Sequence, residues 1–373
     1  MKKLFATIFL LVNWGNAVNG QPTSPLTRVG AHADVVATYS IIGWDSLTGD
    51  LGVAVQSRFL AVGAVVPYAK AGVGALATQA WANTEYGPRG LESLENGLSP
   101  REVVETLLKS DPGSSKRQIG IVDARGYAYA YTGSGCLPYA GHITGHGYSA
   151  QGNILSGDGV VKAMARMFEM TPGDLPDRLL SALDAAQRAE GEKGERQSAA
   201  ILVVRERGGY GGFNDRMIDL RVDDDSLPLF QLRRIYKVWQ QSYLPEVQMR
   251  SIEMFNQRKN FAAAQELTRR MVSALNEELR EKPDDPDMLT SVAWALTTNN
   301  IDRVRALELA KRAVKLVPGN SNILNTLAEC HYQLRHFDEA IAIESELVGK
   351  DPTNDNYWKQ LQKFKEAKQE DVK

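Results

Sequence analysis

The hydrophobic pattern of the chain changes near residue 240, and this change constrains the fold more than any other feature. Between residues 36 and 240 the sequence is rich in glycine, valine and short apolar runs such as DLGVAVQSRF and GVGALATQAW, which are typical of buried strands bounded by turns. From residue 245 to residue 373 the strand signals stop, and the apolar residues follow the spacing of amphipathic helices. We therefore expect a sheet-containing domain followed by an all-helical domain.

Helix signals in the first domain are grouped and do not alternate with strands. The pattern predicts helices over 86–96, 99–109, 160–170 and 175–188, with groups of strands before, between and after the two pairs. Ser99 and Pro100, followed by Glu102, form a typical helix start, with serine at the N-cap and proline first in the helix. This order predicts a layered α+β domain.

Proline and alanine recur in the second domain with a period close to that of tetratricopeptide repeats. Pro283, Pro318 and Pro352 lie 35 and 34 residues apart, and Ala306 and Ala340 lie 34 residues apart, each near the start of a second helix. Alanine lets paired helices approach closely, and proline closes each unit. The region thus resembles a stack of helical hairpins that offers a surface to a protein partner.

Two of these repeat units are clear and a third is degenerate; they cover 287–320, 321–354 and 249–282. Because two full repeats are fewer than the usual minimum of three, a plain helical bundle is the alternative.

The first twenty residues have the order of a secretory signal. Lys2 and Lys3 precede an apolar run from Leu4 to Val12, and small residues follow as far as Gly20. The run is too short to span a membrane, and no later stretch is long and apolar enough to do so. We expect a cleaved signal at 1–20, a spacer or propeptide at 21–35, and export to the periplasm or the cell exterior; an uncleaved anchor is the alternative.

Charge and metal-binding residue types exclude several classes of function. The 43 lysines and arginines nearly balance 45 aspartates and glutamates, which argues against nucleic acid as the main partner. Cys136 and Cys330 are too few for a four-cysteine zinc site. His142 and His146 lie four apart, but in a glycine-rich segment without a carboxylate at ligand spacing. We therefore expect neither a metal nor another cofactor.

Thr38 opens the first expected strand and would be a nucleophile if the chain began there. The hydroxyl of an N-terminal threonine can attack a carbonyl, and its own α-amine, with a pKa of about 7.7–8.0, can take the proton. This chemistry requires cleavage of the bond between Ala37 and Thr38. Without that cleavage, a threonine at the start of a strand is simply a residue that favours β-structure.

Five segments of the first domain carry a family resemblance. In chain order they are TYSIIGWDSLTGDLGVAVQSRFLAVGAVVPYAKAGVGALATQAWAN, YGPRGLE, GYSAQGNIL, RQSAAILVVR and GYGGFNDRMIDLRVDD. With them the domain resembles the domain of unknown function 1028 family, which is placed in the Ntn-hydrolase (N-terminal nucleophile) superfamily. The resemblance implies a four-layer αββα sandwich and assigns to Thr38 the role of nucleophile.

The resemblance also implies roles for neighbouring residues. In relatives such as proteasome subunits, a Ser-Arg pair on the second strand follows an acidic residue, and a lysine lies near the nucleophile. Here Ser57-Arg58 and Lys70 occupy similar places, but the residue before the pair is Gln56, so the acidic residue is missing. We assign Lys70 to catalysis and Arg58 to substrate binding; a solvated turn lysine is the alternative for Lys70.

The remaining candidates follow from the chemistry of amide hydrolysis. Asn153 offers a side-chain amide for the developing oxyanion, and the segment from Gln79 to Ala82, or Gly152, offers backbone N–H groups. Gln79 is therefore a candidate for substrate binding. Gln151 is a candidate for substrate binding, as is Arg89, whose guanidinium can clamp a carboxylate. The alternatives are structural amides for Gln151 and Asn153 and a surface ion pair for Arg89.

Two functions of different classes are consistent with the sequence. The first is an exported Ntn-type amidohydrolase or peptidase that acts on a small amide or peptide through a processed N-terminal threonine. The alternative is a non-catalytic binding or scaffolding protein that keeps the Ntn fold and binds a partner through its helical repeats. Assembly into a homo-oligomer is left open.

Overall fold

The computed structural model describes residues 37–191 and 196–371. The expected signal at 1–20 and spacer at 21–35 lie outside the described residues. The chain from Val36 onward forms one compact unit. A domain boundary between residues 240 and 245 stays a prediction.

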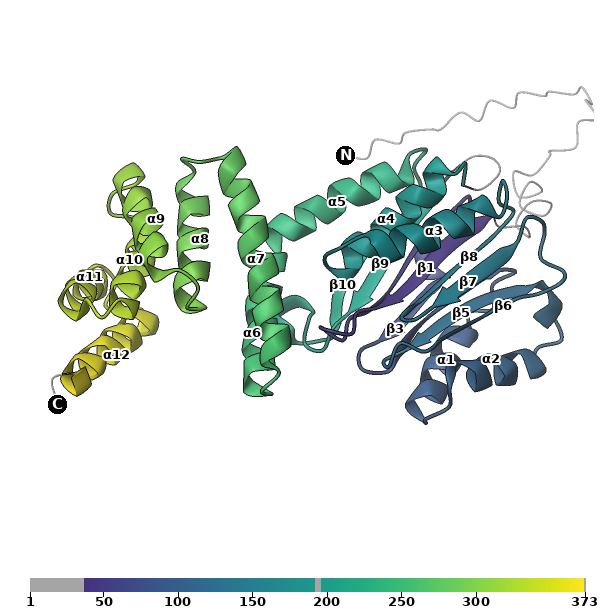
Figure 1. The fold of residues 1–373 in the computed structure, drawn as a ribbon, viewed down its shortest axis with the longest axis horizontal. Helices are drawn as coiled ribbons and strands as arrows, with labels where there is room; N and C mark the ends of the chain where they lie inside the picture. Colours follow the sequence, from purple (N-terminus) through teal and green to yellow (C-terminus); the bar gives the residue numbers. More distant parts are fainter. Residues whose placement is uncertain (1–36, 192–195, 372–373) are drawn as a thin grey trace, which may run out of the picture. The chain divides into compact units, whose positions relative to one another are not determined.

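Two antiparallel sheets pack face to face in the first part of this unit (Figure 1). The larger sheet has the strand order β10-β9-β2-β1-β8-β7, and its strands are β1 (Thr38–Trp44), β2 (Leu51–Ser57), β7 (Gly141–Gly145), β8 (Tyr148–Asn153), β9 (Ser198–Val204) and β10 (Arg216–Val222). The smaller sheet has the order β3-β4-β5-β6, and its strands are β3 (Pro67–Lys70), β4 (Gly74–Ala80), β5 (Arg117–Asp123) and β6 (Ala128–Thr132).

A pair of helices covers the outer face of each sheet. Helices α1 (Tyr86–Glu95) and α2 (Pro100–Lys109) pack on the smaller sheet, and α3 (Gly159–Met170) and α4 (Leu175–Arg188) pack on the larger one. The Ser99 capping box with Glu102 starts α2, as its sequence predicts. The layers therefore follow the order αββα, and the expected α+β sandwich is confirmed.

Strand β1 shows how the sequence sets the layers. Tyr39 and Ile41 point to α3 and α4 and belong to the core beneath these helices. Ile42 belongs to the core between the sheets. Side chains alternate between the two faces of a strand, so Thr38 and Ser40 lie on the same inner face as Ile42. The start of β1 therefore brings hydroxyl groups between the sheets.

The rest of the chain is helical. Its helices are α5 (Pro228–Ser242), α6 (Leu244–Gln257), α7 (Phe261–Glu281), α8 (Pro286–Thr298), α9 (Arg303–Leu316), α10 (Ser321–Gln333), α11 (Phe337–Lys350) and α12 (Asp355–Asp371). Helix α5 packs on β9 and β10, whereas α8 pairs with α9 and α10 pairs with α11. Ala306 and Ala340 are fully buried in these pairs, as expected of the small residue that lets two repeat helices approach.

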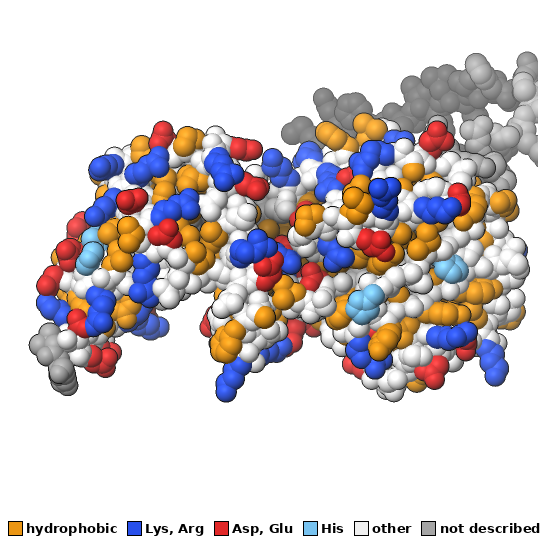
Figure 2. Space-filling view, viewed as in Figure 1, with side chains coloured by type: hydrophobic (Ala, Val, Ile, Leu, Met, Phe, Trp, Pro, Cys, Tyr) orange, Lys and Arg blue, Asp and Glu red, His pale blue; other side chains and the backbone are white. Residues whose placement is uncertain are grey.

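The visible face of the molecule carries both signs of charge. Figure 2 shows lysine and arginine side chains interspersed with aspartate and glutamate over the sandwich and the helical region. This distribution agrees with the formal net charge of -2. Within the described residues, no helix combines the length and the apolar character needed to cross a membrane.

Candidate functional site

The space between the two sheets has an apolar half and a polar half. The apolar half is built around Ile42, Val53 and Val122. The polar half lies where β1 begins, and we call it the interlayer polar cluster; its members each expose at most 1% of their surface and are Thr38, Ser40, Ser57, Gln79, Gln118, Ser149, Gln151 and Asn153. Burying so many hydroxyls and amides costs free energy unless they are hydrogen-bonded. The cluster is therefore the candidate functional site.

Ser57 links the residues on both sides of the peptide bond that precedes Thr38. Its hydroxyl donates to the carbonyl oxygen of Ala37 at 2.7 Å, and the Arg58 backbone N–H donates to the same oxygen at 3.2 Å. The hydroxyl oxygens of Ser57 and Thr38 lie 2.9 Å apart. Because the single hydroxyl hydrogen of Ser57 points to Ala37, Thr38 is the donor in this contact. Two donors thus polarise the Ala37 carbonyl, and the Thr38 proton has an acceptor.

Two side-chain amides hold the other carbonyl of this segment. Gln79 Nε2 and Asn153 Nδ2 donate to the Thr38 carbonyl oxygen at 3.3 and 3.5 Å. The same two nitrogens also donate to Gln118 Oε1, at 2.9 and 3.2 Å. Gln118 therefore fixes the orientation of both amides, and through them the backbone of Thr38.

A second set of contacts extends the cluster along β1. The Ser40 hydroxyl donates to Gln79 Oε1 at 2.5 Å and accepts from Gln151 Nε2 at 2.6 Å. Ser149 donates to Gln151 Oε1 at 2.7 Å. Gly120 leaves room for this chain of contacts, because a Cβ atom there would lie 2.3 Å from Gln151 Oε1. The network is connected from Thr38 to Ser149.

The cluster also reaches the surface through Gln118. Its Nε2 lies 2.9 Å from Thr132 Oγ1, which in turn lies 2.8 Å from Nδ1 of the exposed His142. Partial burial lowers the pKa of His142, because it disfavours the charged imidazolium. Within the described residues, no three histidine, cysteine, aspartate or glutamate side chains gather as metal ligands.

The structure brings some of the sequence-predicted residues to Thr38 and leaves others apart. Gln79, Gln151 and Asn153 are members of the interlayer polar cluster. The exposed Arg58 touches the segment only through its backbone N–H.

Lys70 and Arg89 lie outside the cluster. Lys70 pairs with Gly74 at one end of β4, whereas Gln79 lies near the opposite end, and its ammonium forms an ion pair of 2.6 Å with Glu95. Arg89 is exposed on α1 and lies 3.7 Å from Glu85, the surface ion pair considered as its alternative. A lysine spacing in the sequence could not reveal that the strand places Lys70 at the far end of the sheet.

Sequence reasoning assigned no role to Gln118, Ser40 or Ser149. The signal that identifies them is the alternation within strands of otherwise apolar character. In β8, every second residue is polar, namely Ser149, Gln151 and Asn153, and all three face the space between the sheets. Polar residues at these buried positions predict an internal hydrogen-bond network.

The helical region contains a pocket of about 320 Å³ between α6, α7, α8 and α10. Met249, Met271, Leu275 and Trp294 supply its apolar wall, and Asn325 lies among its polar residues. The side-chain oxygen of Asn325 is buried and has no hydrogen-bond partner among the described residues. An acceptor left in this state costs free energy until a donor reaches it.

Comparisons with known proteins match two separate parts of the chain. A model of a family of unknown function, DUF1028, matches residues 38–232, and a tetratricopeptide repeat model matches residues 302–363. The crystal structure of a DUF1028 protein from Silicibacter pomeroyi is 30% identical, with a TM-score of 0.50 over 55% of this chain and 89% of that one.

A second solved structure matches a smaller share of the chain. The first tetratricopeptide repeat of Spaghetti, bound to an HSP90 peptide, is 15% identical, with a TM-score of 0.24 over 33% of this chain and 91% of that one. No curated protein matches the chain.

Proposed function

The chain belongs to the family of unknown function DUF1028, joined to a tetratricopeptide repeat region, and we propose that it is an exported Ntn-type amide hydrolase or peptidase whose nucleophile is Thr38. The observation that carries this proposal is the pair of contacts made by Ser57, to the Ala37 carbonyl at 2.7 Å and to the Thr38 hydroxyl at 2.9 Å. Export is proposed from the signal pattern of residues 1–20.

Activation begins at the bond between Ala37 and Thr38. Thr38 Oγ1 attacks the Ala37 carbonyl carbon while Ser57 and the Arg58 N–H stabilise the charge that develops on the carbonyl oxygen. The bond between the Ala37 carbonyl carbon and the Thr38 nitrogen breaks, and the proton lost by the Thr38 hydroxyl ends on this nitrogen. Water then hydrolyses the resulting ester and leaves a carboxylate on Ala37 and a free amine on Thr38.

The same groups serve the reaction on a substrate amide. The free α-amine of Thr38, with a pKa of about 7.7–8.0, takes the hydroxyl proton as the oxygen attacks the substrate carbonyl. It then gives this proton to the leaving amine as the substrate carbon–nitrogen bond breaks, and water hydrolyses the ester that remains on Thr38. The substrate carbonyl oxygen then occupies the place that the Ala37 oxygen holds in the structure, within reach of Ser57 and the Arg58 N–H. Gln79 and Asn153 keep their contacts to the Thr38 carbonyl and so position the nucleophile.

Intact mass and N-terminal sequencing of protein recovered from an exporting host test this proposal. We expect a mature chain that begins at Thr38. In Thr38→Ala we expect the bond between residues 37 and 38 to stay intact, whether or not the signal at 1–20 is removed. Thr38→Ser keeps a hydroxyl and is the matched control, with processing retained. A terminus that stays upstream of Thr38 through prolonged incubation, in a protein that is nonetheless folded, contradicts the proposal.

The pocket between α6, α7, α8 and α10, which we call the groove, favours a second function, the binding of a protein partner. An extended peptide segment has apolar side chains for Met249, Met271 and Trp294 and backbone N–H groups for the unpartnered oxygen of Asn325. This function requires no cleavage ahead of Thr38, so it is the one that remains if the chain keeps its N-terminal residues.

Variants of the groove test partner binding. We expect partners recovered with the wild type to be lost with Asn325→Leu and kept with Asn356→Ala, an exposed asparagine outside the groove. Each recovered partner is then purified and titrated with both variants. Equal affinity for wild type and Asn325→Leu contradicts binding in this groove.

A further inference from the structure

A second polar pocket, of about 350 Å³, lies at the opposite end of β1 from Thr38. Trp44 and Asp45 line it at the end of β1, Glu169 and Arg178 line it from α3 and α4, and Arg270 lines it from α7. Trp44 is six residues beyond Thr38 on the strand, about 20 Å at the usual rise of a strand. The pocket is therefore separate from the interlayer polar cluster, and its volume suits a small molecule.

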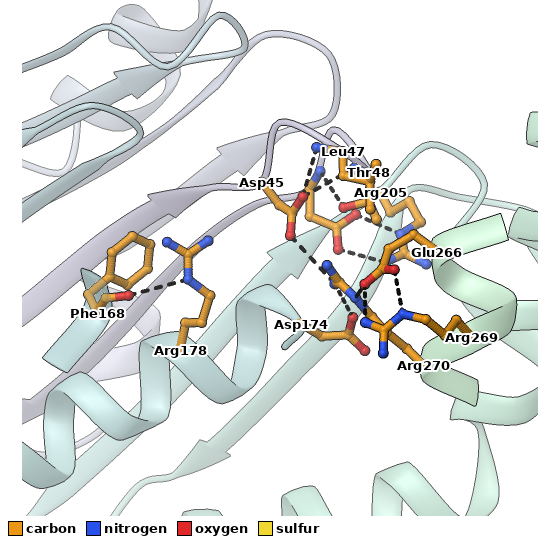
Figure 3. A network of polar contacts seen from close by, with 11 residues as sticks. Asp45, Leu47, Thr48, Phe168, Asp174, Arg178, Arg205, Glu266, Arg269 and Arg270 are labelled. Carbon is orange, nitrogen blue, oxygen red and sulfur yellow. Dashed lines mark hydrogen bonds and ion pairs between the residues drawn. The ribbon is translucent and has the colours of Figure 1, made fainter. Parts of the chain in front are cut away.

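Arg270 is neutralised by its neighbours. Its Nη1 lies 2.6 Å from Asp174 Oδ1 and 3.8 Å from Asp45 Oδ2, and its Nε lies 2.8 Å from Glu266 Oε1. Figure 3 shows these carboxylates converging on Arg270 where α7 meets the sandwich. These ion pairs balance the charge of the Arg270 guanidinium, so it offers little net positive charge to a ligand.

Arg178 differs from Arg270 because it forms no ion pair with any carboxylate of the described residues. Its Nε donates to the Phe168 carbonyl at 3.4 Å, and its guanidinium lies 4.1 Å from the centroid of the Phe168 ring. Its two terminal nitrogens point away from that carbonyl (Figure 3), and among the described residues they form no hydrogen bond or ion pair. Partial burial lowers the pKa of Arg178; the charge of Asp45 opposes this shift and the charge of Arg270 adds to it. The two terminal nitrogens of Arg178 can therefore donate a bidentate pair of hydrogen bonds to a ligand carboxylate.

The wall of the pocket also carries negative charge. Glu169 Oε1 accepts from the Tyr148 hydroxyl at 2.6 Å, and Asp45 Oδ1 accepts from the backbone N–H groups of Leu47 and Thr48 at 2.8 and 3.2 Å. These carboxylates oppose a dianion such as phosphate and favour an ammonium group. A ligand that matches both kinds of group carries one negative and one positive charge.

We propose that this pocket binds a free α-amino acid. The carboxylate of the amino acid lies on the terminal nitrogens of Arg178, and its ammonium group lies toward Asp45 and Glu169. The rings of Trp44 and His146, which meet edge to face at 5.7 Å, flank its side chain.

Titration calorimetry and thermal unfolding of the full chain test the proposal with each of the twenty standard L-amino acids, up to about 10 mM. We expect at least one to bind saturably and to raise the unfolding midpoint. Acetate, ethylamine and inorganic phosphate, at the same concentrations, should bind at least about tenfold more weakly, since each matches only part of the pocket. Binding by none of the twenty amino acids overturns the proposal, and so does phosphate binding of equal strength.

Three variants locate the binding groups. Arg178→Met should weaken amino-acid binding at least about tenfold, and Arg188→Met, at an exposed position on the same helix, should leave it unchanged. Glu169→Gln keeps an acceptor for Tyr148 but removes the charge, so it should weaken amino-acid binding and spare acetate. If Arg178→Met fails to fold, the amino-acid affinity of Glu169→Gln tests the proposal. An amino-acid affinity equal to that of the wild type, in either Arg178→Met or Glu169→Gln when folded, overturns the proposal.

Discussion

The hydroxyl of Ser57 on β2 donates to the carbonyl oxygen of Ala37, the residue that precedes β1, at 2.7 Å. This contact orients the peptide bond whose cleavage is proposed to activate the protein. Ser57→Ala removes one of two donors to that oxygen and also the acceptor for the Thr38 proton. We expect processing to slow by about a hundredfold, the usual effect of removing one oxyanion donor.

The measurement is the rate at which the precursor mass converts to the mature mass. Ser46→Ala, at an exposed turn position, is the matched control and should process normally. A Ser57→Ala protein that matures at the wild-type rate would show that the contact has no part in cleavage.

Gln118 is the residue on which the interlayer polar cluster depends most. Its Oε1 accepts from Gln79 and Asn153, and its Nε2 lies 2.9 Å from the Gly152 carbonyl oxygen. Gln118→Leu removes one hydrogen-bond partner from each of these buried groups, so we expect a loss of about 3 kcal/mol in the free energy of unfolding. Urea denaturation measures it, with Gln241→Leu on the exposed face of α5 as the control. A loss no greater than that of the control would mean that water or a rearranged side chain replaces Gln118.

Gly120 provides a steric test of the same network. A Cβ atom there would lie 2.3 Å from Gln151 Oε1 and 2.7 Å from Ser149 Oγ. Gly120→Ala should therefore displace Gln151 and destabilise the fold by about 1–3 kcal/mol. Gly157→Ala is the control, because a Cβ atom at Gly157 meets nothing within 4 Å. Equal unfolding midpoints for the two variants would contradict the close packing described here.

The sequence predicts the layers of the sandwich well because each layer leaves a local signature. The helix expected over 175–188 is α4 itself, and the Ser99–Glu102 capping box is present. The candidate site depends on contacts between distant strands, which no local pattern contains. Lys70 illustrates this: its spacing from Thr38 along the sequence predicts a place near the nucleophile, but the register of β3 on β4 places it beside Glu95. Gln118, a polar residue in an otherwise apolar strand, does predict a buried hydrogen bond, but its partners lie on other strands and no local pattern identifies them.

The packing of α6 on the sandwich predicts where the chain can be shortened. Arg205 and Asp50 form a buried ion pair of 2.6 Å, and Arg205 Nη1 also donates to Ser251 of α6 at 3.1 Å. A chain that ends at Ser242 loses this acceptor and exposes the apolar surface that α6 covers on the sandwich. A chain that ends at Gln257 keeps the Ser251 acceptor and keeps that surface covered. We expect the shorter chain to be less stable by about 1–3 kcal/mol. Thermal unfolding of the two truncations decides, and equal midpoints would show that α6 does not support the sandwich.

Glu344 should make the helical region less stable as the pH rises. It is fully buried in α11, neither of its carboxylate oxygens has a hydrogen-bond partner among the described residues, and burial raises its pKa from 4.5 to about 7, with a further contribution from Glu329. Below pH 4.5 the carboxyl is protonated in both the folded and the unfolded chain, so it has no effect on stability. Between pH 4.5 and about 7 the unfolded chain ionises first, so stability falls, by at most about 3 kcal/mol, and then levels off once the folded chain ionises too.

Glu344→Gln removes this titration, so the variant should gain stability over the wild type as the pH rises from 5 to 8. Urea denaturation at several pH values measures the difference, and Glu339→Gln, an exposed neighbour on the same helix, should show almost none. A difference between Glu344→Gln and wild type that stays constant over this range would mean that Glu344 is ionised in the folded protein throughout. In that case a cation or water must contact the Glu344 carboxylate inside the helical region. Glu344→Leu, which cannot make this contact, would then destabilise the helical region at pH 8 instead of stabilising it.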